Sequence, residues 1–169
     1  MVKIHETTTK SIAIMSDNDL YRYQLTRSWD DDKQKATVIM LNPSKADMLK
    51  TDRTVMNVNN FMVDSDYGSM TIVNLFAYMT TDPKLLTQRD NDYESLNNDY
   101  LVEAFKSSDV IVVAWTRSNH INRKREVERL LQSFQEKVKC FADETGKKPR
   151  HPRDLGESWT LEDYVFEFN

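Results

Sequence analysis

The chain contains a single cysteine and only three glycines among its 169 residues. One cysteine, Cys140, cannot form an intrachain disulfide, and this usage fits a reducing compartment, so we expect a cytoplasmic protein. The small number of glycines argues against long flexible linkers, and the chain shows no internal repeat or low-complexity segment. One domain spanning residues 1–169 is therefore the simplest expectation.

Long apolar runs are also missing. No run approaches the roughly 18 residues that a membrane span needs. Residues 1–5 are followed by threonines rather than by the apolar stretch of a secretion signal. The hydrophobic fraction of 39% and the charged fraction of 30% are ordinary for a water-soluble protein. We therefore expect no association with a membrane.

The chain also lacks an excess of positive charge, because its formal net charge is −4. This balance disfavours a protein that coats nucleic acid through a broad basic surface. Basic residues do gather in segments 117–129, which includes Arg117 and Arg125, and 147–153. Each segment has two interpretations, a local phosphate contact or an ordinary solvated surface.

The sequence shows no pattern of metal ligands. The three histidines, His5, His120 and His151, and the one cysteine lie far apart without ligand spacing. The acidic run at residues 30–32 is typical of a solvated turn. We expect neither a metal nor another cofactor.

The chain does contain an alternation of apolar runs with helical patterns. The runs are continuous, as in strands covered on both faces, and between them apolar residues recur at spacings of three and four. Residues 11–29 alternate around a polar turn and predict an N-terminal β-hairpin. The pattern predicts an α/β fold with a central, mainly parallel, four-stranded sheet. The apolar runs are 36–41, 70–75, 110–115 and 138–141, and the helical patterns are 52–64, 93–107 and 122–137.

A distinctive polar or aromatic group follows or ends each predicted strand. Ligands of open parallel sheets bind outside the carboxyl ends of the strands, where loops and helix N-termini meet. The groups are Asn42-Pro43-Ser44, Asn74, Trp115-Thr116 and His151-Pro152. Each also has an ordinary interpretation: a turn, a partnered buried amide, a core aromatic residue and an exposed loop histidine, respectively. Their convergence on one edge of the sheet favours a ligand site.

The motifs and their order resemble those of a bacterial and phage family of unknown function. The longest motif is Leu-Asn-Pro-Ser-x-Ala-Asp at residues 41–47, and the similarity spans most of the chain. This resemblance implies no established activity. The other motifs are Arg27-Ser28-Trp29, Asp52-Arg53-Thr54, Asn74-Leu75-Phe76-Ala77, Ala114-Trp115 and His151-Pro152.

A more distant resemblance is to the uracil-DNA glycosylase superfamily, and it implies a three-layer sandwich with helices on both faces of the sheet. In that superfamily an Asn-Pro or Asp-Pro motif follows the first strand and an Asn lies near the end of the next. A Trp-Gly then ends a later strand, and a His-Pro-x-x-Leu loop completes the site. The matching residues are Asn42-Pro43, Asn74, Trp115 and 151–155. Departures from the family pattern are Leu41 and Thr116 in place of glycines, and Arg153-Asp154 in place of small residues.

The superfamily resemblance implies roles for individual residues. As catalytic residues, Asn42 would position a water and His151 would donate a hydrogen bond to the base oxygen as charge develops there. Asp47 and Asp52 are further acidic candidates for the site, although both also fit the start of a helix. The implied base- or nucleotide-binding residues are Asn74 at the base edge, Phe61 or Phe76 and Trp115 against the base, Leu155 in the gap left by a flipped nucleotide, and Ser44 and Arg153 at phosphates.

Three kinds of function stay open. The first is recognition of a modified or deaminated base by a hydrolase of the DNA-glycosylase type. The second is non-catalytic binding of a free nucleotide or of nucleic acid. The third is a protein-interaction module, such as a phage-borne inhibitor, that uses the C-terminal segment 164–168. That segment equally fits an element docked on its own domain.

Overall fold

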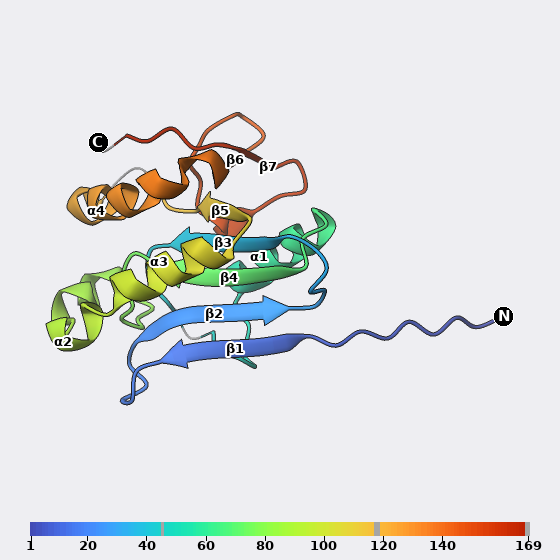
Figure 1. The fold of residues 1–169 in the computed structure, drawn as a ribbon, viewed down its shortest axis with the longest axis horizontal. Helices are drawn as coiled ribbons and strands as arrows, with labels where there is room; N and C mark the ends of the chain where they lie inside the picture. The colour runs from blue at the N-terminus through green and yellow to red at the C-terminus, as the bar shows by residue number, and fades with distance from the viewer. Residues whose placement is uncertain (45, 117–118, 168–169) are drawn as a thin grey trace.

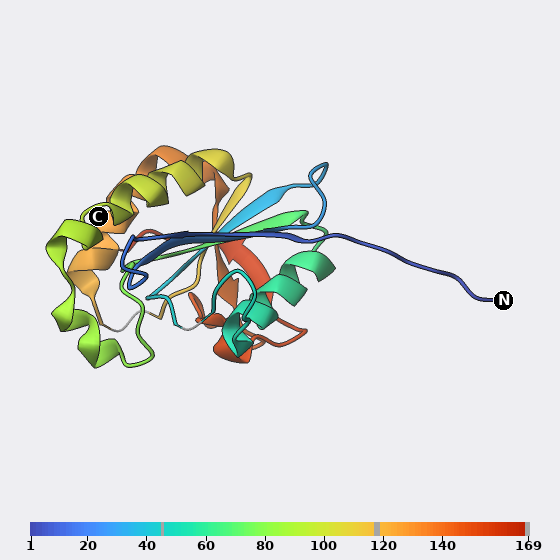
Figure 2. The ribbon, with the colours of Figure 1, turned by 90° about the horizontal axis from the view of Figure 1, so that it is seen from below.

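The computed structural model describes residues 1–44, 46–116 and 119–167. Three residues of the sequence analysis, Lys45 of the long motif, Arg117 of the first basic segment and Phe168 of the C-terminal segment, lie outside the described residues. The described chain forms a seven-stranded mixed sheet with strand order β1-β2-β4-β3-β5-β6-β7. Figures 1 and 2 show helices on both faces of this sheet.

The four apolar runs form the centre of the sheet. They correspond to β3 (Lys35–Met40), β4 (Ser69–Asn74), β5 (Val110–Val113) and β6 (Val138–Ala142). All neighbouring pairs in the order β4-β3-β5-β6 are parallel. The α/β class and the parallel centre are therefore confirmed, and the mostly apolar sequences of these strands fit their burial on both faces.

The expectation of a four-stranded sheet is wrong. The predicted hairpin, β1 (Lys10–Met15) and β2 (Arg22–Ser28), joins the sheet because β2 pairs antiparallel with β4. At the other edge, β7 (Thr160–Asp163) pairs antiparallel with β6. Both additions cover edges of the parallel centre that would otherwise expose unpaired backbone groups.

Helix α1 (Arg53–Asp64) covers one face of the sheet, and α3 (Asn97–Ser107) and α4 (Ile121–Leu131) cover the other, as Figure 2 shows. Two predicted helices are shorter than expected. The pattern at 93–107 splits into α2 (Asn91–Glu94) and α3, and the pattern at 122–137 ends in a 3₁₀ helix, η2 (Gln132–Lys137). The remaining short helices are η1 (Pro83–Gln88) and η3 (Pro152–Asp154).

Two hydrophobic clusters fill the spaces between the sheet and its helices. Side chains alternate between the two faces along a strand, so Val113 packs in the cluster under α3 and α4 whereas Val112 packs in the cluster under α1. Val55, Val58 and Met62 recur along α1 at helical spacing and are all buried. Among the described residues, no helix combines the length and the apolar character that crossing a bilayer requires.

The C-terminal segment packs on the domain as far as it is described. Tyr164 is buried and its ring lies edge-on to Trp115, with the centroids 6.0 Å apart. Phe166 packs against the same cluster, and the backbone N–H of Glu167 donates to Glu128 Oε1 at 3.1 Å. The aromatic residues 164 and 166 thus contribute to the core of the molecule.

Candidate functional site

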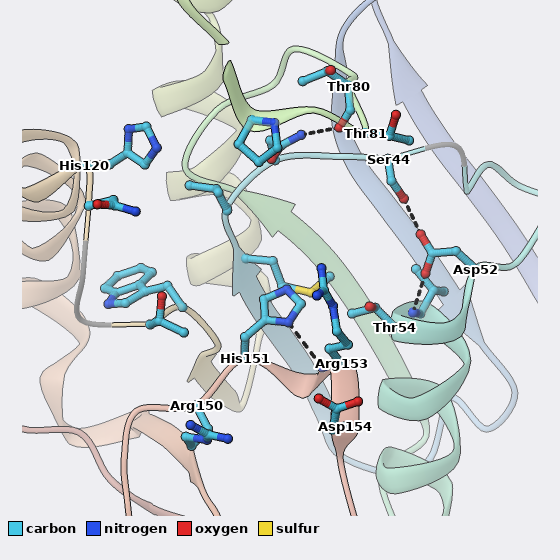
Figure 3. Close-up of a pocket in the computed structure, with 18 of the residues that line it drawn as sticks. Ser44, Asp52, Thr54, Thr80, Thr81, His120, Arg150, His151, Arg153 and Asp154 are labelled. Atoms are coloured by element: carbon cyan, nitrogen blue, oxygen red, sulfur yellow. Dashed lines mark hydrogen bonds between the residues drawn. The ribbon is translucent and has the colours of Figure 1, made fainter. Parts of the chain in front are cut away.

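A cavity of about 590 Å³ opens at the carboxyl ends of the central strands. Its walls come from the segments after β3 and β5, the start of α1, the segment after β4 and the η3 loop, as Figure 3 shows. This volume lies within the range typical of small-molecule sites. The residues expected in the site that line the cavity are Asn42, Ser44, Asp52, Trp115, His151 and Arg153.

Asn42 is held by backbone groups next to the cavity. Its side-chain Nδ2 donates to the carbonyl oxygen of Thr80 at 2.6 Å and to that of Pro43 at 3.1 Å. The backbone N–H of Thr80 in turn donates to the Pro43 carbonyl at 3.0 Å, which ties the segment after β4 to the segment after β3. Because both donor bonds use Nδ2, Oδ1 is the amide atom left to accept a hydrogen bond from a water or a ligand.

Asp52 combines a structural role with a position in the cavity wall. Its side chain caps α1 by accepting from the backbone N–H of Val55 at 2.8 Å. The other carboxylate oxygen accepts from the hydroxyl of Ser44. Both oxygens therefore have protein partners, and the helix-capping alternative weighed for Asp52 is the one observed.

His151 presents a hydrogen-bond donor at the cavity. Its Nδ1 accepts from the backbone N–H of Arg153 at 3.2 Å, so in the neutral ring the proton resides on Nε2. Burial lowers the pKa of His151 below its ordinary value, and the charge of Arg153 lowers it further against the opposing carboxylates of Asp154 and Asp52. The neutral form with Nε2–H is thus favoured near neutral pH.

The loop that carries His151 is tied to α1. The side-chain Nδ2 of Asn57 donates to the carbonyl oxygens of Arg153 at 2.9 Å and Pro152 at 3.3 Å. Asn57 therefore helps to fix the η3 loop against the helix that Asp52 caps. Asn57 was not among the expected site residues, because a polar residue on a helix gives no signal of the loop it will contact.

Two expected site residues lie close to the cavity without lining it. Asn74 is 1% exposed, and neither Nδ2 nor Oδ1 has a hydrogen-bond partner among the described residues. Its register partner on β3, Met40, does line the cavity. Asp47 holds a turn instead, because its Oδ1 accepts from the backbone N–H groups of Leu49 and Lys50, both at 2.7 Å, and these bonds lower its pKa.

The other expected site residues lie elsewhere. Phe61 and Leu155 line a second hollow, of about 670 Å³, beside the C-terminal half of α1. Phe76 is buried, with the Arg89 guanidinium 4.2 Å from its ring centroid and the His120 ring 5.1 Å away. Arg125 is exposed on α4.

The cavity also contains cations that were not among the expected site residues, although Lys124 lies in the basic segment 117–129. Arg22 and Lys124 line it, and both side chains are almost fully buried. The ammonium of Lys124 donates to the carbonyl oxygen of Thr116, and burial lowers its pKa. Neither residue follows a predicted parallel strand, so the rule that led to the other site residues could not find them. Among the described residues, no group of three or more His, Cys, Asp or Glu side chains is placed to hold a metal ion.

A cavity with converging polar groups at the carboxyl ends of parallel strands defines an α/β protein with a candidate ligand site. Residues 22–153 match the family described as "Protein of unknown function (DUF1643)", and the chain belongs to that family. This agrees with the expected resemblance to a family of unknown function. No curated protein matches the chain.

One solved structure with similarity to the chain is described as a "Putative hydrolase from Agrobacterium vitis S4". The two chains are 11% identical, with a TM-score of 0.39. The similarity covers 78% of this chain and 47% of the other, so this chain spans about half the length of that protein.

Proposed function

We propose that the cavity recognises a nucleobase or a nucleotide, in a domain of the uracil-DNA glycosylase type. The observation that supports this most is the meeting of Asn42 and His151, which lie far apart in sequence, in the wall of one cavity. Nucleobase edges present both hydrogen-bond donors and acceptors. The Oδ1 of Asn42, which accepts no hydrogen bond from the described residues, and the Nε2–H of His151 supply both kinds of group.

The order of the site segments also supports the proposed type of domain. Asn42-Pro43 follows β3, Asn74 ends β4, Trp115 follows β5, and the His151 loop comes after β6. These are the places that the superfamily pattern assigns to its motifs. The parallel order β4-β3-β5-β6 brings these strand ends to one edge, which is where ligands of such sheets bind.

The direct test is a binding and product screen. The protein is incubated with oligonucleotides that carry uracil, thymine mismatches or modified bases, and with free nucleosides and nucleotides, and the mixture is analysed by mass spectrometry. Retention of a base-containing ligand supports recognition, and Asn42→Ala should weaken it. Asn60→Ala, on the outer part of α1 away from this cavity, is the matched control. If the whole panel fails to bind or react, the proposal is wrong.

A second candidate function is hydrolysis of an N-glycosidic bond, and it is favoured by the tautomer of His151. In this reaction a water attacks C1′ of the sugar, the bond from C1′ to the base nitrogen breaks, and the base leaves with the bonding electrons. The proton that the water loses passes to solvent, and the departing base anion takes one up. An Nε2–H donor placed at the base oxygen would stabilise the developing charge. Asn42 Oδ1 would orient the water, but an amide cannot take its proton as a carboxylate does, so slow turnover is expected.

Hydrolysis is tested by following both products. Released base is measured by chromatography, and isotopically labelled water should leave its oxygen on C1′ of the sugar product. Asn42→Ala removes the amide oxygen that would orient the water, and we expect it to lower the rate of base release. Binding without any release would leave the proposed recognition in place and exclude this second candidate for the ligands tested.

A further inference from the structure

Arg22 reaches the cavity because of an irregularity in the hairpin. In the pairing of β1 with β2, Ile14 lies opposite Gln24 and Met15 lies opposite Arg22, so Tyr23 has no partner on β1. Such a bulge shifts the alternation of side-chain faces between the residues on its two sides, here Arg22 and Gln24. Tyr23 stacks on Tyr100 of α3 with ring centroids 4.6 Å apart, whereas the Arg22 guanidinium lines the cavity and donates to the carbonyl oxygen of residue 46.

The Arg22 guanidinium is buried without an ion pair. The residue is 2% exposed, and no carboxylate of the described residues lies within the 4.0 Å that defines an ion pair. Its Nε has no hydrogen-bond partner in the described part of the chain. Burial lowers the pKa of Arg22 to about 10, although the more distant carboxylates of Asp52 and Asp47 oppose this shift, and the group stays charged at neutral pH. A buried charge without a close counter-charge is unfavourable unless a ligand supplies one.

The surroundings of Arg22 are positively charged although the chain is acidic. The formal net charge of the chain is −4. The cavity is lined by Arg22, Lys124, Arg150 and Arg153 against the two carboxylates of Asp52 and Asp154. Arg150 is already paired with Asp143, with Nε 3.1 Å from Oδ2, so the excess of positive charge in the cavity rests on Arg22, Lys124 and Arg153. The Asp52 oxygens already accept from Ser44 and Val55, and Asp154 forms an exposed ion pair with Arg53 at 3.7 Å. Positive charge gathered in a low-dielectric cleft attracts anions.

The start of α4 adds to this field. Residues 119 and 120 line the cavity, and α4 begins at Ile121. His120 makes no side-chain capping bond and the first turn contains no acidic residue. The N-terminus of a helix carries partial positive charge. By contrast, α1 starts at the same cavity with its N-terminus capped by Asp52.

We infer that Arg22 binds a terminal phosphate group, so that the ligand of the cavity is a free nucleotide carrying a phosphate monoester. The part of this inference that concerns the base rests on the proposed function. The part that concerns the phosphate rests on the buried guanidinium of Arg22. A phosphodiester inside a polynucleotide continues on both sides and cannot reach a guanidinium that is 2% exposed. A monoester ends in free oxygens, and an arginine binds such oxygens through paired N–H groups.

The experiment is calorimetry on the full chain with matched ligands. The ligands are the common nucleosides, their 5′-monophosphates, ribose 5-phosphate, inorganic phosphate and a short oligonucleotide without terminal phosphates. We expect a monophosphate to bind about tenfold or more tightly than its nucleoside, as one charge-assisted contact can provide. Arg22→Gln should remove that difference. Arg27→Gln, on the same strand but outside the cavity, should preserve it.

The outcomes separate the phosphate site from the proposed function. Equal affinity for nucleoside and monophosphate overturns the phosphate site and keeps base recognition. Ribose 5-phosphate bound as tightly as any nucleotide, and lost in Arg22→Gln, supports the phosphate site and overturns base recognition. Binding of an oligonucleotide that has only internal phosphates overturns the inference if Arg22→Gln abolishes that binding. If Arg22→Gln does not fold, the comparison of nucleoside with monophosphate in the unmodified protein decides.

Discussion

Two sets of polar residues in and beside the cavity differ in their partners. The rim set, Asn42, Asp52 and His151, lines the cavity and is hydrogen-bonded to neighbouring backbone or hydroxyl groups. The buried polar set, Arg22 and Asn74, is almost fully buried, yet Arg22 Nε and both amide atoms of Asn74 have no partner among the described residues. The rim set is therefore fixed before a ligand arrives, whereas the buried polar set is not satisfied by the protein alone.

This difference in partners predicts that the two sets affect the stability of the fold in opposite ways. A buried polar group without a partner destabilises the fold by its desolvation penalty, and an apolar residue of the same shape can restore that free energy. Polar groups that already have partners stabilise the fold, and removing them is unfavourable. Substitutions in the two sets should thus shift the free energy of unfolding in opposite directions.

The largest expected effect concerns the donor of the rim set. His151→Ala removes the Nε2–H at the cavity, and we expect ligand affinity or turnover to fall by about 10²-fold, as when one preorganised donor is lost. His151→Gln places an amide donor at a similar reach and should retain part of the function. His5→Ala, in the exposed N-terminal segment, is the control. Calorimetry and base-release assays measure the effect, and unchanged values for His151→Ala would show that the ring does not contact the ligand.

The next effect concerns the structural side of the rim set. Asp52→Ala removes the cap of α1 and the acceptor of the Ser44 hydroxyl, so the free energy of unfolding should fall by about 1–2 kcal/mol. Asp64→Ala, at the exposed C-terminal end of the same helix, should leave it nearly unchanged. Denaturant titration of both variants measures this. Equal stabilities would mean that the cap and the Ser44 bond contribute little.

Much of the fold was predictable because strands β3 to β6 are buried on both faces and leave continuous apolar runs in the sequence. Strand β7 was not predictable, since Thr160–Asp163 contains one apolar residue and is held by pairing with β6. The attachment of the hairpin to β4 was not predicted either, because it also depends on backbone pairing between segments distant in sequence. Pairing of backbone groups between distant segments leaves no mark in the pattern of either segment.

The site was predictable where it depends on the ends of parallel strands. Asn42, Trp115 and His151 were singled out by that rule, and all three line the cavity. Arg22 was not, because the direction of its side chain depends on the bulge at Tyr23. Asn57 was missed as well, since its role comes from the η3 loop, which is distant in sequence.

A smaller effect, of opposite sign, concerns the buried polar set. Asn74→Leu keeps the branching of the side chain and removes two unsatisfied polar atoms, so the protein without ligand should gain about 1 kcal/mol in stability, or roughly 2–4 °C in Tm. Asn97→Leu is the matched control. Asn97 is also buried and its Oδ1 also lacks a partner among the described residues, but its Nδ2 donates to the carbonyl oxygens of Asn74 and Leu75 at 3.0 and 3.1 Å. That variant should be less stable. If Asn74→Leu destabilises the protein as well, the amide has partners in solution and the contrast between the two sets fails.

The smallest effect is the dependence of stability on pH through His151. Burial holds the pKa of His151 below the ordinary 6.5 in the folded chain, so near and below that pH the unfolded state binds the proton more readily than the folded state. The stability contributed by neutral His151 is therefore present above pH 6.5 and is lost progressively as the pH falls towards the folded pKa. His120 has a lowered pKa too and contributes with the same sign. The free energy of unfolding is measured above and below pH 6.5. The difference between the two values should be smaller in His151→Gln than in the unmodified chain, and the same measurement on His120→Gln gives the contribution of His120. An unchanged pH dependence in His151→Gln would show that the ring is as solvated in the folded chain as in the unfolded one.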